Sequence, residues 1–160
     1  MKKVLVGKVV STHGIKGEIK ILSDFQFKDK VFKVGNKLMI SDELFEIKSY
    51  RHHKNFEMVT LNEYTNINEV LFLMKKKVYV NEDDLKLDND EVLDDELINY
   101  NIVTTNGQVG KIKEIFLASP TNKIIRAQFD NEKLIPYQKP IIKNIDKEKK
   151  EIIVELISGM

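Results

Sequence analysis

One short segment near the start of the chain holds a hydroxyl, an imidazole and a carboxylate, on Ser11, His13 and Glu18. A catalytic triad uses such groups, but it is defined by convergence in space and not by closeness in sequence. The segment also carries Gly14 and Gly17, which permit the backbone angles that a tight connection between strands needs. It is therefore open to three interpretations: a structural turn, a binding loop, or the site of a small hydrolase.

The densest basic cluster is Arg51-His52-His53-Lys54, which we expect in an exposed loop between two strands. Such a loop is either simply solvated or a contact for RNA, because Lys and Arg supply charge for phosphates while His stacks or hydrogen-bonds. No metal is expected at the paired histidines, since no acidic or thiol ligand accompanies them.

The composition excludes several other kinds of site. The 160 residues include no cysteine and three histidines, which excludes disulfides, thiolate metal sites and a cysteine nucleophile. The glycine-to-lysine spacing of a P-loop is missing, as is the strand–helix alternation of a dinucleotide-binding fold. No apolar run is long enough to span a bilayer, and the start is too short for a signal peptide. We expect a cytoplasmic protein.

The net charge of +1 is unevenly distributed along the chain. Residues 1–80 carry 15 basic and 9 acidic side chains, residues 81–96 carry one and 9, and residues 97–160 carry 10 and 7. An acidic block of this kind is typical of a solvated linker, or else it repels nucleic acid or docks a basic protein. The pattern predicts two domains, 1–80 and 97–160, joined by an acidic linker at 81–96.

Apolar alternation predicts a mainly β chain. In the first domain we expect strands at 3–10, 18–22, 37–40, 44–49, 56–61 and 77–80, enough for a small closed barrel. A helical period at 67–74, with Asn66 and Glu69 as a capping box, predicts one short helix. In the second we expect strands up to 103 and at 109–117, 124–129, 133–136, 141–145 and 151–157. Asn106-Gly107 predicts a type I′ hairpin turn, whose two central residues need positive φ.

Several stretches, in this order, resemble motifs of the RimM family of ribosome maturation factors. They are residues 6–18, Arg51 with His53-Lys54, 67–70 with 76–80, Gly107 with Val109-Gly110, 134–137, and Asp146 with 151–156. The resemblance covers nearly the whole chain. The opening motif followed by the Leu-Ile-Pro-Tyr strand is specific.

The resemblance implies two small β-barrels, an N-terminal barrel similar to that of translation factors and a C-terminal PRC-type barrel. It implies a protein that is not an enzyme and carries no cofactor. The implied partners are the precursor of the small ribosomal subunit, a head ribosomal protein of the S19 type and 16S rRNA, whose 3′ domain it helps to mature. We expect a monomer that does not contact a membrane.

The chain departs from the family at the entry to the second barrel. The family often has two adjacent tyrosines there, associated with subunit binding, where this chain has Val92 and Leu93. An apolar contact framed by acids still suits a basic ribosomal protein. The residues expected to bind the ribosomal protein are Glu91, Val92, Leu93, Asp94, Leu97 and Tyr137. Tyr137 also has an alternative interpretation, as a half-buried residue of the core.

The remaining candidate residues lie in loops and turns. Those expected to contact rRNA or the subunit are His13, Lys16, Arg51, His53 and Lys54. Those expected to shape turns are Gly14, Gly17, Asn106 and Gly107. Two alternative functions stay open: a general RNA-binding barrel without a ribosomal protein partner, and a small hydrolase that uses His13 with Ser11 or Glu18.

Overall fold

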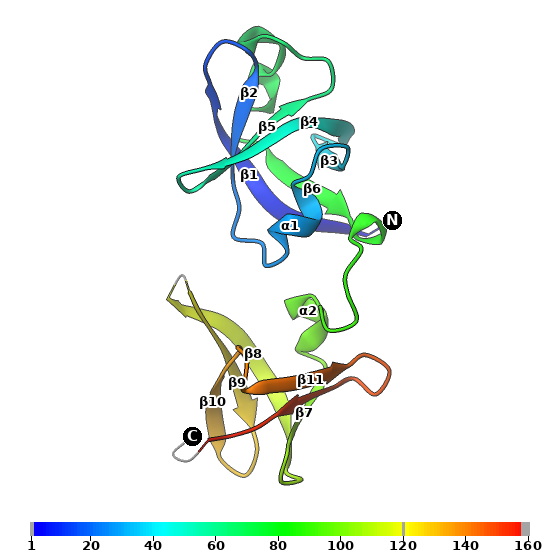
Figure 1. Cartoon of the computed structure of the whole chain (residues 1–160), viewed down its shortest axis with the longest axis vertical. Helices are drawn as coiled ribbons and strands as arrows, with labels where there is room; N and C mark the ends of the chain where they lie inside the picture. Colours follow the sequence, from blue (N-terminus) through cyan, green and yellow to red (C-terminus); the bar gives the residue numbers. More distant parts are fainter. Residues whose placement is uncertain (1, 120, 158–160) are drawn as a thin grey trace. The chain divides into compact units, whose positions relative to one another are not determined.

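A computed structural model describes residues 2–119 and 121–157 of the chain (Figure 1). The contacts divide the chain into two compact units, Met1–Lys86 and Leu87–Met160. Both units are built from β-strands, so the expectation of a mainly β protein with two β-sheet domains is confirmed. No helix within the described residues is long and apolar enough to cross a membrane.

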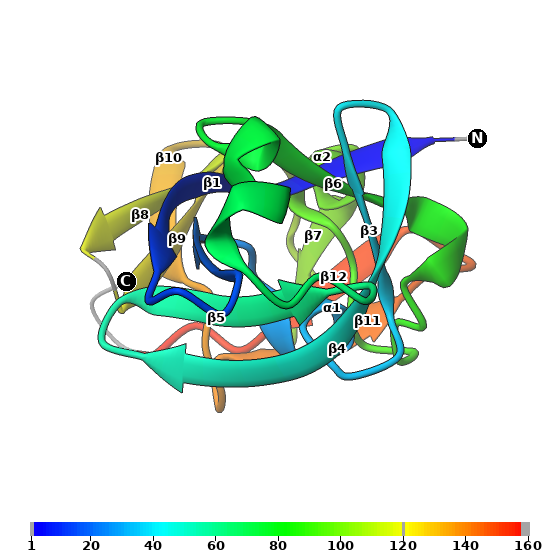
Figure 2. The same ribbon diagram turned by 90° about the horizontal axis from the view of Figure 1, so that it is seen from above.

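The first unit is a closed barrel with the strand order β1-β2-β5-β4-β3-β6, whose strands are all labelled in Figure 1 and, except for β2, in Figure 2. The strands are β1 (Lys3–His13), β2 (Glu18–Leu22), β3 (Lys37–Ile40), β4 (Glu43–His53), β5 (Phe56–Leu61) and β6 (Lys77–Asn81). Alternate side chains point inward, and those of Ile19, Ile21 and Ile47 are completely buried. The long strands β1 and β4 carry bulges, which bend them enough to close the ring.

Short helices fill the connections of this barrel: α1 (Lys28–Val31), η1 (Ile67–Glu69), η2 (Leu71–Leu73) and η3 (Glu82–Asp84). The predicted helix at 67–74 is wrong in type, because it consists of two 3₁₀ turns. Val70 lies between them at φ −114° and ψ 0°, and its side chain is buried. The capping box of Asn66 and Glu69 is confirmed. Packing of Val70 and Leu73 into the barrel has prevailed over regular helical hydrogen bonding.

The predicted basic loop is also different, because most of it is strand. Arg51, His52 and His53 belong to β4, where Arg51 pairs with Met58 and His53 with Phe56 of β5. The turn itself begins at Lys54, which has a φ of 56°. The paired part of the β4–β5 hairpin is therefore longer than the sequence indicates.

The second unit is a six-stranded sheet with the order β10-β9-β8-β7-β12-β11. Its elements are α2 (Asp94–Leu97), β7 (Asn101–Thr104), β8 (Val109–Ser119), β9 (Asn122–Gln128), β10 (Glu132–Pro136), β11 (Ile142–Asp146) and β12 (Glu151–Val154). β7 and β12 pair in parallel, and all other neighbours are antiparallel. Within the described residues, strand pairing does not close this sheet into a barrel, because β10 and β11 are its two end strands and do not pair with each other. Pro136 ends β10 and has no N–H to donate.

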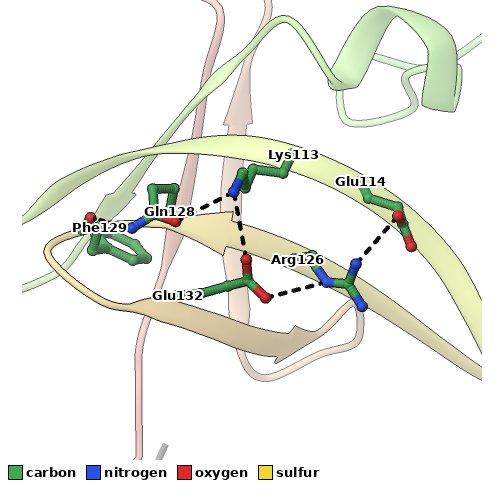
Figure 3. Close-up of polar contacts among 6 residues, drawn as sticks. All are labelled: Lys113, Glu114, Arg126, Gln128, Phe129 and Glu132. Carbon is green, nitrogen blue, oxygen red and sulfur yellow. Dashed lines mark hydrogen bonds and ion pairs between the residues drawn. The ribbon is translucent and has the colours of Figure 1, made fainter.

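One face of this sheet buries a cluster of apolar side chains and the other carries charge. Ile102, Ile125 and Ile152 are among the completely buried members of the cluster. On the exposed face, Glu132 pairs with Lys113 at 3.5 Å and with Arg126 at 3.4 Å (Figure 3). Charged pairs of this kind suit a solvated face next to an open edge.

The turn at Asn106-Gly107 is not of type I′. Gly107 has a φ of 92°, but Asn106 is not among the residues with positive φ. The buried hydroxyl of Thr104 organises this loop instead, since it donates to the side chain of Asn106 and accepts from the amide of Gln108 at 2.9 Å. Hydrogen bonds of the Thr104 side chain therefore stabilise a loop in which Gly107 has a positive φ and Asn106 does not.

Gly7 tests how tightly the first barrel closes. A Cβ atom at Gly7 would lie 2.8 Å from the carbonyl oxygen of Leu22 and 2.9 Å from Cγ2 of Ile21. We expect Gly7→Ala to lower the free energy of unfolding by about 1–3 kcal/mol in urea denaturation, through overpacking. The control is Gly14→Asn, in an open turn at φ 69° that Asn tolerates, where we expect little change. A Gly7→Ala protein as stable as the wild type would contradict this account.

Candidate functional site

Two hairpin ends of the first barrel lie side by side and carry most of the residues expected to contact RNA. His13 pairs with Glu18 where β1 meets β2, and His53 pairs with Phe56 where β4 meets β5. The hairpins are neighbours because β2 pairs with β5. The antiparallel register therefore gathers side chains about forty positions apart in sequence at one end of the barrel.

Arg51 is held by Glu18 through a two-fold contact. Its Nε donates to Oε2 of Glu18 at 3.0 Å, and its Nη2 donates to Oε1 at 2.8 Å. This pairing lowers the pKa of the Glu18 carboxyl and raises the pKa of Arg51. The Arg51 side chain is still 48% exposed, so one face of the oriented guanidinium remains available to solvent.

The two histidines of this barrel end lie close together, with ring centroids 6.3 Å apart. Desolvation lowers the pKa of His53, and the charges of Arg51, Lys54, His13 and Lys20 lower it further. His53 is therefore neutral at neutral pH, in a neighbourhood that is itself positive. The neutral imidazole of His53 can stack on a base or accept a hydrogen bond, while the neighbouring cations meet phosphates.

Lys16 and Lys54 occupy the turns at this end of the barrel, and both are exposed. The Gly14–Gly17 turn has φ values of 69° at Gly14 and 88° at Gly17. It is tied to η1, because the amide of Ile67 donates to the carbonyl of Ile15 at 3.0 Å. His13, Arg51, His53 and Lys54 thus come together, and Lys16 lies in the adjacent turn.

The second unit carries an acidic cluster around Tyr137. Lys123 of β9 links its members, since its Nζ lies 2.7 Å from Oδ1 of Asp94 and 5.1 Å from the centre of the Tyr137 ring. Burial raises the pKa of Tyr137 to about 12, and the charges of Asp94, Asp90 and Glu91 add to this effect. Acidic side chains therefore lie near the Tyr137 hydroxyl, an arrangement that suits a basic partner.

Three of the residues expected to meet the ribosomal protein are buried. Val92 is 1% exposed, Leu93 7% and Leu97 0%, and Val92 and Leu97 belong to the apolar cluster of the second unit. An apolar side chain next to a core gains more by packing there than by remaining in water. These three residues can position the acidic segment, but their side chains do not form its surface.

Two residues that contact the predicted site residues were not identified as their partners from the sequence. Glu18 orients Arg51, 33 positions away, and Lys123 joins Asp94 to Tyr137. Neither contact is local in sequence, so only the tertiary structure reveals them. The contact between Arg51 and Glu18 counts against the hydrolase alternative, because Glu18, its candidate acid, is already bound to Arg51.

No group of three or more His, Asp or Glu side chains that could hold a metal ion occurs among residues 2–119 and 121–157. What the two sites offer is charge and hydrogen bonding. The first is basic and partly aromatic, with Nζ of Lys20 lying 5.2 Å over the ring of Phe56. The second is acidic, and its apolar side chains are buried beneath the acids. Both arrangements are typical of binding surfaces for macromolecules.

Comparison with known proteins identifies relatives for both units. The model of the RimM N-terminal domain matches residues 4–85, and the model of the RimM PRC barrel domain matches residues 94–160. The ribosome maturation factor RimM of Ligilactobacillus salivarius is 37% identical over 162 residues, which cover 97% of this chain and 96% of that protein. RimM of Bacillus mycoides is 35% identical over 164 residues, which cover 97% and 96%. The solution structure of the N-terminal domain of RimM from Thermus thermophilus matches with a TM-score of 0.47 and 17% identity, covering 54% of this chain and 98% of that one.

The raised pKa of Tyr137 gives a test of the acidic cluster. We expect its ring carbon to titrate near pH 12 by nuclear magnetic resonance, against about 10 for an ordinary tyrosine. Because the unfolded phenol ionises first, the free energy of unfolding should fall as the pH rises from about 10 to 12. Tyr50, whose pKa is also raised to about 12, contributes to the same fall, so Tyr137→Phe should reduce it and not abolish it. Titration of Tyr137 near pH 10 would rule out the buried acidic environment.

Proposed function

The chain belongs to the RimM family of ribosome maturation factors, and from this premise we propose that it holds a head ribosomal protein and nearby 16S rRNA together during maturation of the small subunit. Members of this family are not enzymes, so the hydrolase alternative falls away. The finer proposal concerns the partners: a head protein of the S19 type on the second unit, and the 3′ domain of 16S rRNA on the first.

The observation that carries the proposal is the opposite charge of the two sites. The first barrel presents Arg51, His53 and Lys54 with His13 at one end, while the second unit presents acids around Tyr137. Ribosomal RNA is a polyanion, and proteins that bind it directly are commonly basic. An acidic site therefore suits such a protein and a basic site suits the RNA, on one chain.

The RNA side of the proposal rests on preorganised donors. Arg51 is fixed by Glu18, so little side-chain entropy is lost when its free edge meets a phosphate. Lys54 stands at the tip of the same hairpin. His13 and His53 add flat rings beside these cations, and flat rings stack on unpaired bases.

The protein side rests on exposed acids over a buried support. Val92 and Leu97 fix the backbone of the segment from below, and Asp94 is held by Lys123. Asp90 and Asp95 are exposed, and Glu91 is partly exposed and accepts from the amide of Asp88 at 2.8 Å. The proposed contact is therefore mainly electrostatic, with Tyr137 as its aromatic component.

The RNA contact can be tested by the salt dependence of subunit binding. We expect Arg51→Ala with Lys54→Ala to weaken binding to immature small subunits and to reduce the slope of log affinity against log salt by about 2, one for each phosphate that the variant no longer binds. The control is Lys28→Ala with Lys33→Ala, which removes the same charge elsewhere on the barrel. An unchanged slope in the hairpin variant would remove this loop from the RNA site.

The protein contact can be tested by replacing two acids of the segment 90–97 with the corresponding amides. We expect Glu91→Gln with Asp95→Asn to weaken association with the S19-type protein in a pull-down, most clearly at low salt, because two attractive charges are removed. Glutamine can still accept from the amide of Asp88, so the segment should keep its shape.

Asp83→Asn with Asp84→Asn is the matched control, because it removes two exposed acids from η3 of the first unit. Equal binding by the Glu91, Asp95 variant and the wild type would contradict the acidic site. Tight binding to naked rRNA with no ribosomal protein in the pull-down would favour the alternative of a general RNA-binding barrel.

A further inference from the structure

A second basic site lies on the outer side of the first barrel, away from the hairpin ends. A hollow of about 320 Å³ opens beside β6, between the start of β1 and the turn that joins β3 to β4. Its charged side chains are Lys3, Lys75, Lys76, Lys77 and Asp42, and the ring of Tyr79 contributes to its wall. Four bases and one acid give the hollow a net charge of +3.

The backbone around this hollow is fixed by the barrel itself. The amide of Lys75 donates to the carbonyl of Val9 at 2.9 Å, and the amide of Val9 donates to the carbonyl of Lys76 at 2.9 Å. Lys75 has a φ of 65°, so the chain turns sharply there before β6 begins. On the opposite side, Met39 of β3 pairs with Tyr79 of β6. The lysine side chains are flexible, but the points from which they extend are not.

Only part of the positive charge is neutralised within the barrel. Lys3 pairs with Asp42 at 3.2 Å, and its Nζ lies 5.4 Å from the centre of the Tyr79 ring. Among the described residues, no acidic side chain forms an ion pair with Lys75, Lys76 or Lys77. Three adjacent cations around a solvated hollow repel one another, and an anion between them would relieve that repulsion.

We propose that this hollow binds the phosphate backbone of RNA, as a second RNA contact on the barrel. The proposal rests on the proposed function for its RNA. Lysines act as point charges and favour phosphates without reading sequence, and the hollow has room for phosphate groups with bridging waters. An extended backbone offers several phosphates in succession, which matches a row of three consecutive lysines better than a single small anion does.

The hollow is separate from the site at the hairpin ends. Lys77 pairs with Lys8 of β1, five residues before His13, and five residues of strand span up to about 17 Å. This distance is about two Debye lengths at physiological salt, so the two sites act on different phosphates. One RNA strand that runs along the barrel could meet both.

The test measures binding of the full chain to a transcript of the 3′ domain of 16S rRNA by fluorescence anisotropy. We expect Lys76→Gln with Lys77→Gln to weaken binding and to reduce the salt slope by about 2, while Lys28→Gln with Lys33→Gln changes it much less. All four positions are at least partly exposed, so both variants should fold, and thermal unfolding verifies this. An equal loss in the two variants would mean a general effect of charge and would overturn the site.

Asp42→Asn provides a change of the opposite sign. It removes the carboxylate that lines the hollow and frees Lys3, so we expect tighter binding and a steeper salt slope. Asn tolerates the φ of 64° at this position, so the turn is retained. Unchanged binding in Asp42→Asn would count against the hollow.

The outcomes separate this inference from the proposed function. If Lys76→Gln with Lys77→Gln binds the transcript like the wild type while Arg51→Ala with Lys54→Ala does not, the hollow is not an RNA site and the proposed function stands. If lysine-dependent binding to the transcript persists but the wild type never sediments with immature subunits, the hollow stands as an RNA site and the maturation role fails.

Discussion

Closure of the first barrel depends on the long strand β1, which pairs with two neighbours along different parts of its length. β1 pairs with β6 from Lys3 to Lys8 and with β2 from Lys8 to His13, so the ring closes only because this strand changes direction in between. Two bulges and the close approach of Gly7 to Leu22 make the change possible. The same geometry separates the ends of β1. Lys3 is therefore part of one basic site and His13 part of another, although both belong to one continuous strand.

The second unit differs from the first, because its sheet has two end strands that no further strand pairs with among the described residues. Its buried face is apolar at the centre, and its outer face is covered by charged pairs such as Arg126 with Glu132. The segment before β7 packs Val92 and Leu97 into this core and leaves its carboxylates outside. One short segment, residues 90–97, thus supplies both the acidic surface and the buried apolar residues beneath it. Lys123 pairs with Asp94, so this acid is held in place and not merely solvated.

Local patterns predicted the strands well and the sites only in part. Alternation identified Glu18–Leu22 correctly, because one-sided burial imposes a period of two. The strand Phe56–Leu61 was also predicted correctly, although three consecutive residues in it are buried. Alternation missed that Arg51 to His53 extend a strand, since their cross-strand partners, and not their own side chains, make them β. The burial of Val92 could not be read either, because an apolar residue among acids fits an exposed contact as well as a core. The hollow beside β6 required the register of β3 against β6, which no local pattern carries.

The low net charge of the chain explains why two weakly attracting sites are more useful together than either would be alone. The net charge is only +1, and screening limits each local field to about 10 Å at ordinary salt, so neither site attracts its partner from afar. Phosphate contacts carry no sequence information, which means that the basic barrel alone cannot select one rRNA domain. In the proposed function, selection comes from the acidic site and its protein partner. Once that partner is bound, nearby RNA meets the barrel at a high effective concentration, and weak contacts suffice.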